Sequence, residues 1–160
     1  MILSKEARDV LITGVASQEF GTEIANAIDS ANTFPWKTSK TTLTAAQINA
    51  LNVTPVRLVP PVSKAIIQPF VFLMVYRYGT IPFTIGGATQ FRVQYEGSPT
   101  ILIGTAPRVG FINQSSSQTE GSHVGQYTVK ANEGVDLFVS APIASGDGEL
   151  DVYVFYNVLG

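Results

Sequence analysis

Few residues in this chain have the types and spacing needed for nucleophilic or acid–base chemistry. The single histidine, His123, follows Ser122, and Ser140 is a second serine that could form a nucleophile–base pair with it. A lone histidine in a polar stretch is more often a solvated side chain, by roughly ten to one. The chain has no cysteine, which excludes thiol catalysis and disulfides. We therefore expect a protein that is not an enzyme.

Three carboxylates near the C-terminus have the alternate spacing of a calcium loop. They are Asp147, Glu149 and Asp151, but Val152 stands where such a loop has a glycine. Glycines at 146 and 148 make a plain turn the better interpretation, by roughly five to one. Neither a zinc spacing nor a phosphate-binding glycine loop is present. The sequence predicts no metal site and no cofactor.

The overall charge is low in both senses. Ten basic and twelve acidic residues give a net charge of -2, and only 14% of the 160 residues are charged, against about 25% in a typical domain. Such a chain has no basic field for nucleic acid. With 45% hydrophobic residues, a monomer would be poorly covered by its charges. We expect part of the surface to be buried against other chains, in a homo-oligomer.

The longest apolar stretch, residues 66–78, predicts a central strand that is covered on both faces. It is shorter than the roughly 20 residues that span a bilayer, and it contains Gln68 and Pro69. The stretch 10–16 follows acidic Glu6 and Asp9, whereas a secretion signal begins with positive charge. We expect no membrane partner and a chain made in the cytoplasm.

Residues 1–42 differ in texture from the rest and are predicted to be a helical N-terminal arm with a linker. A helix is expected over residues 19–31, with an apolar stripe at 24, 27, 28 and 31. Ile24 and Ile28 belong to this stripe, and Phe34 and Trp36 follow it. Exposed aromatic residues fill partner pockets well, although packing onto their own domain is an equally good interpretation. The Ser/Thr-rich stretch 37–42 is interpreted as the linker.

Residues 43–160 are predicted to form one β domain. Thr44 and Gln47 have the spacing of a helix capping box, and Pro55 marks an edge strand. Residues 97–99 are read as a turn, 114–122 as a mobile polar loop and 146–148 as a hairpin turn. The expected strands are 53–59, 65–78, 89–96, 100–104, 108–113, 124–130, 135–141 and 149–158. About eight antiparallel strands with short turns predict an all-β, jelly-roll-like β-sandwich.

Four segments in this order resemble a group of tailed-bacteriophage head decoration (cement) proteins with a jelly-roll domain. They are residues 43–51, 54–60, 64–67 and 146–156, and residues 23–29 are similar to the lead-in segment of that group. The resemblance covers roughly three quarters of the chain and rests on turn and strand patterns. A Gly-rich loop common in the group is replaced here by Pro61, Val62 and Ser63, which puts only that loop in doubt.

The resemblance implies a structural virion protein on the phage head surface, assembled in the host cytoplasm. It would bind the major capsid protein of the assembled head as a homotrimer, with no catalytic residue to carry over. We expect Ile24, Ile28, Phe34 and Trp36 to contact the capsid partner. The alternative is a receptor- or glycan-binding module of a tail or head fibre. Exposed aromatic and Asn or Asp side chains in loops 79–88 and 114–122 would favour that alternative.

Overall fold

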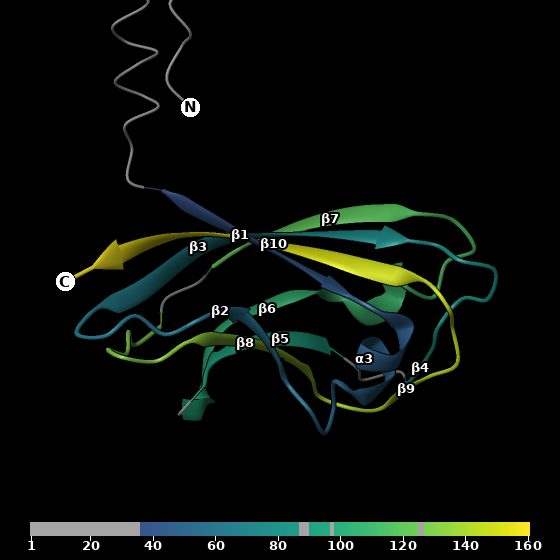
Figure 1. Ribbon diagram of the computed structural model, residues 1–160. Coiled ribbons are helices and arrows are strands. Elements are labelled where there is room, and N and C mark those ends of the chain that lie inside the picture. The colour runs from purple at the N-terminus through teal and green to yellow at the C-terminus, as the bar shows by residue number, and fades with distance from the viewer. Residues whose placement is uncertain (1–35, 87–89, 97, 125–126) are drawn as a thin grey trace, which may run out of the picture. The chain divides into compact units, whose positions relative to one another are not determined.

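A computed structural model describes residues 36–86, 90–96, 98–124 and 127–160. They form two four-stranded antiparallel sheets stacked as two layers (Figure 1). Sheet A has the order β1-β10-β3-β7, and its strands are Lys37–Leu43, Glu149–Leu159, Ile66–Arg77 and Gln118–His123. Sheet B has the order β2-β8-β5-β6, and its strands are Val56–Val59, Val135–Val139, Gln90–Tyr95 and Ser98–Arg108.

The pairing of these eight strands is nested. The first strand pairs with the last, β1 with β10, and the second with the last but one, β2 with β8. Inside these lie β3 with β7 and β5 with β6. A long hairpin folded in this way across two sheets is a jelly roll. The predicted all-β, jelly-roll-like sandwich of about eight strands is therefore confirmed.

The core lies between the two layers. Phe91, Val93 and Tyr95 of β5 are fully buried, as their alternation predicted. Facing them are fully buried side chains of sheet A, among them Met74, Tyr76, Leu150, Val152 and Val154. The polar ends of the aromatic side chains are satisfied, since the Tyr95 hydroxyl donates to the Ile67 carbonyl at 2.5 Å. Burial of this apolar surface is the main stabilising term of the domain.

One end of the sandwich is closed by short elements. Helix α3, Ala45–Ala50, begins at the capping box predicted for Thr44 and Gln47, with both reciprocal hydrogen bonds present. A two-stranded ladder joins β4, Thr84–Ile85, to β9, Ile143–Ala144. Within the described ranges, no helix is long and apolar enough to span a membrane.

The predicted linker over residues 37–42 is wrong, because these residues belong to β1. All seven residues of β1 pair with β10, from Lys37 opposite Tyr156 to Leu43 opposite Leu150. Threonine is β-branched and suits a pleated edge strand, so a Ser/Thr-rich stretch was a poor sign of a loop here. The compact unit begins at Trp36. The helical arm itself lies outside the described residues and stays a prediction.

Three other predictions were wrong in the second half of the chain. Residues 97–99 were expected to turn, but β6 already runs from Ser98. The loop at 114–122 contains β7, and the strand expected at 108–113 is mostly the 3-10 helix η1, Val109–Phe111. Residues 127–130 of the strand expected at 124–130 are not in a strand. Because β7 is a polar edge strand, it lacks the apolar alternation by which strands are recognised.

Candidate interaction surface

Half-exposed apolar side chains cover the outer face of sheet A. Successive side chains of a strand point to opposite faces, so the buried residues of β10 leave Tyr153 and Phe155 pointing outward. Tyr153 lies opposite Leu73, and Phe155 lies opposite Val71. We use the name apolar face for the outer side chains of Trp36, Phe70, Val71, Leu73, Val75, Tyr153 and Phe155. In the described chain, β3 is thus fully buried on its inner face only.

A bulge in β3 adds one aromatic residue to this face. The register between β10 and β3 shifts at Phe155 and Tyr156, which leaves Phe70 as the extra residue beside Val71. Alternation alone had assigned Phe70 to the inner face, which is wrong, although Pro69 was predicted to mark a bulge and does so. The rings of Phe70 and Trp36 lie 5.2 Å apart. Trp36 therefore packs on its own domain and still remains 57% exposed.

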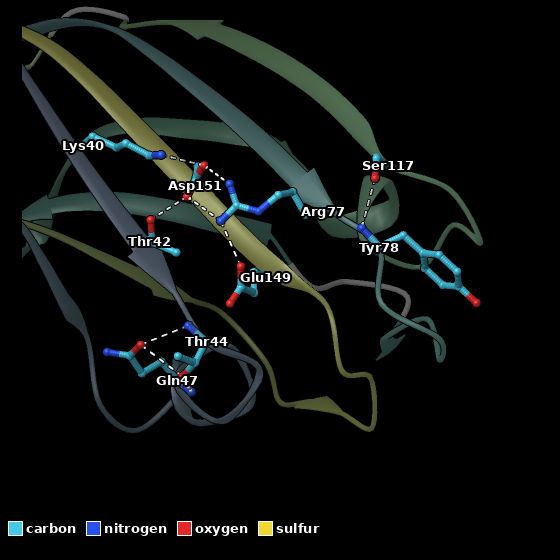
Figure 2. A network of polar contacts seen from close by, with 9 residues as sticks. All are labelled: Lys40, Thr42, Thr44, Gln47, Arg77, Tyr78, Ser117, Glu149 and Asp151. Carbon is cyan, nitrogen blue, oxygen red and sulfur yellow. Dashed lines mark hydrogen bonds and ion pairs between the residues drawn. The ribbon is translucent and has the colours of Figure 1, made fainter.

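One end of the apolar face carries a closed network of charges around Asp151 (Figure 2). Its carboxylate accepts a hydrogen bond from the Thr42 hydroxyl at 2.6 Å and pairs with the Lys40 ammonium at 3.0 Å. Arg77 also binds Asp151, and its second guanidinium nitrogen reaches Glu149 at 2.9 Å. These residues come from β1, β3 and β10, so the network fastens three neighbouring strands together.

The network keeps Asp151 ionised despite its burial, with a side chain only 2% exposed. Burial raises the pKa of Asp151, but the donors on Thr42, Lys40 and Arg77 outweigh it and hold the pKa below the usual 3.8. Asp151 in turn raises the pKa of Lys40 through their hydrogen bond. Both charges therefore persist near neutral pH.

Replacing Asp151 with Asn should destabilise the domain by about 2 kcal/mol at pH 7, because a buried charge-assisted network is lost. The folded-state pKa of Asp151 lies below its unfolded value, so its contribution is present above about pH 4 and is lost as the pH falls through the folded pKa. Chemical denaturation at pH 7 and pH 3 should show the difference between variant and wild type shrinking. An equal difference at both values would assign the loss to packing instead.

The outer face of sheet B is polar by contrast. Arg57 of β2 pairs with Asp136 of β8 and with Glu96 after β5. Arg92 lies with its guanidinium carbon 5.9 Å from the centre of the Phe138 ring. The two outer faces of the sandwich therefore differ in chemistry, and sheet A carries the apolar one.

The structure separates the residues that could have done catalysis. His123 lies in β7 of sheet A, opposite Val71. Ser140 follows β8 of sheet B, and its hydroxyl accepts a hydrogen bond from the Gln90 amide at 3.0 Å. The histidine and this serine thus stand on different sheets. Ser122 precedes His123 in the same strand, opposite Phe72.

The three carboxylates of the calcium-like spacing bind protein donors instead. Asp147 accepts hydrogen bonds from the Thr80 hydroxyl and from the backbone amides of Thr80 and Ile81, which lowers its pKa. Glu149 and Asp151 pair with Arg77. Among the described residues, no cluster of acidic or histidine side chains could hold a metal. The hairpin predicted at 146–148 is wrong, since β9 pairs with β4 rather than with β10.

Of the four predicted partner contacts, Trp36 lies on the apolar face. Ile24, Ile28 and Phe34 fall outside the described residues and stay predictions. Sequence reasoning missed the apolar face as a site, although its signal was present. Val71, Leu73 and Val75 are apolar at every second position of β3, and we had assigned that side to burial within the domain.

Comparison with known proteins gives two solved structures of similar fold. No protein-family model and no curated protein matches the chain. A chain of the cyanophage Pam1 capsid asymmetric unit is 18% identical, with a TM-score of 0.48, over 78% of this chain and 85% of that one. A chain of the Ralstonia phage GP4 capsid is 16% identical, with a TM-score of 0.43, over 78% and 83%.

Proposed function

We propose that this protein is a structural virion protein, a decoration protein that binds the assembled phage head as a homotrimer and stabilises it. It is not an enzyme in this proposal. Its partner is the major capsid protein, and its place is the head surface. The segments that resemble cement proteins support this proposal from the sequence. Stabilisation would follow from linkage, since a protein that binds only the assembled shell favours that state.

The observation that carries the proposal is the asymmetry of the two outer faces. Only the outer face of sheet A is apolar, and Trp36 on that face continues directly into the predicted arm. A soluble antiparallel sheet that faces water normally has polar side chains there. A large apolar patch on a chain with 14% charged residues is typical of a binding surface.

The receptor- or glycan-binding alternative required exposed aromatic side chains in loops 79–88 and 114–122. Phe83 is the aromatic residue in the first of these segments, and it is buried. The second segment has no aromatic residue, and its last five residues lie in β7. We therefore favour the decoration function.

Heads that lack this protein should release their DNA at a lower temperature than complete heads. Adding purified protein back should restore the higher temperature, because the linked contacts of a trimer bind with high avidity. A variant with Ile24→Asp and Ile28→Asp should restore less, since charge on the predicted apolar stripe opposes burial. DNA release can be followed by dye fluorescence during heating.

The matched control is Asn26→Asp, which adds a charge beside the stripe rather than on it. This variant should restore the release temperature fully. If heads without the protein are as heat-resistant as complete heads while adsorption to the host fails, the fibre alternative replaces the decoration function.

A further inference from the structure

We infer that the apolar face of sheet A is the surface that lies against the capsid shell, with sheet B pointing away from it, and that this contact is apolar rather than electrostatic. The inference rests on the proposed function and adds the orientation and the chemistry of binding to it. The occupant is thus a flat, apolar and nearly neutral protein surface made by the assembled major capsid protein.

The charge arrangement of the apolar face selects this kind of partner. Lys40 and Arg77 both bind Asp151, and Arg77 also binds Glu149, so two cations and two anions are closed on one another. The face therefore presents little net charge to a partner. Nucleic acid and anionic membranes attract basic surfaces, and neither would be held by such a network. An apolar protein surface needs no net charge.

The size of the apolar face argues against two copies of this domain simply stacking face to face. Four strands about 4.8 Å apart and seven residues long at about 3.4 Å each give a face of roughly 450 Å². A stable interface needs about 800 Å² from each partner. The remainder must come from another part of the same binding surface.

The position of Trp36 shows which part of the chain is available for this. Thirty-five residues precede Trp36, and they include the predicted contacts Ile24, Ile28 and Phe34. Trp36 belongs to the apolar face itself and packs on Phe70. The chain outside the described domain therefore joins it at this face. One partner, bound through both the face and the preceding segment, gives each a cover.

The test uses the full chain and heads that lack it, with binding measured by co-sedimentation. Phe155→Ser and Leu73→Gln, both on the apolar face, should each weaken head binding at least about tenfold, roughly 1.4 kcal/mol. Phe138→Ser is the matched control, because Phe138 is also half-buried on an outer face but in sheet B. It should leave binding within about twofold. Wild-type affinity should change by less than about threefold between low and high salt.

Folding and oligomeric mass are followed for every variant by circular dichroism and light scattering. If both face variants are folded and bind as wild type does, the inference is wrong and the decoration function stands. If either face variant dissociates the oligomer, the face is an interface between copies and the inference is wrong. A steep fall of wild-type binding with salt would overturn its apolar character. Wild-type protein that does not bind heads would remove the decoration function, and this inference with it.

Discussion

Val154→Asp should leave the domain unfolded at room temperature. Val154 is fully buried in the centre of β10, opposite Phe72 on one side and Ser39 on the other. An aspartate there would bury an unpaired charge, which costs several kcal/mol, and the whole domain has only about 5–15 kcal/mol of stability. Near-ultraviolet circular dichroism and denaturation curves should show loss of cooperative unfolding.

The control is the same change one residue earlier. Tyr153 points to the outer face, where the Lys40 ammonium lies 5.4 Å from the centre of its ring. Tyr153→Asp loses that contact but places a carboxylate near a cation in water, so it should cost no more than about 1 kcal/mol. A Val154→Asp variant as stable as wild type, beside a damaged Tyr153→Asp variant, would mean that the register of β10 is shifted by one residue.

Gly146→Ala should destabilise the domain by about 2–4 kcal/mol, because it combines backbone strain with a steric clash. Gly146 has a φ of +84°, where a side chain is disfavoured. A Cβ at this position would also collide with the Phe83 ring, which is buried and packs on Tyr76. Thermal unfolding should show a lower midpoint, with the native spectrum retained at low temperature.

Gly110→Ala gives the matched comparison. Gly110 lies in η1, and a Cβ there would meet no atom within 4 Å. Its unfolding midpoint should stay within the range of ordinary surface changes, about 0.5 kcal/mol. If the two glycine variants unfolded at the same temperature, the close packing of the 145–148 turn on Phe83 would be refuted.

Sequence periodicity was reliable where one face of a strand is buried. In β5 and β10 the alternation of apolar residues identified Phe91, Val93, Leu150 and Val152 as core residues, because burial selects apolar side chains at every second position. It failed at the edges of sheet A. Residues 37–43 and 118–123 are polar strands held by backbone pairing to β10 and β3, and backbone pairing leaves no pattern in the side chains.

The candidate site could be predicted only in part for a similar reason. The sequence showed that β3 is apolar on both sides, but it could not show whether its second side is covered within the domain or lies outside. Phe70 was assigned to the wrong face because a single extra residue at a bulge shifts the alternation. Trp36 was recognised from its residue type, whereas the network around Asp151 joins residues more than seventy positions apart.

The nested strand order also decides when the chain can fold during its synthesis. β10 lies between β1 and β3 in sheet A, yet it is the last of these strands to be translated. β1 pairs with a strand about 110–120 residues later, so sheet A cannot form until β10 has left the ribosome. A polypeptide that stops before residue 149 would leave β1 and β3 without their shared neighbour. Incomplete chains would therefore have no stable sandwich, and only full-length translation products would be available for assembly.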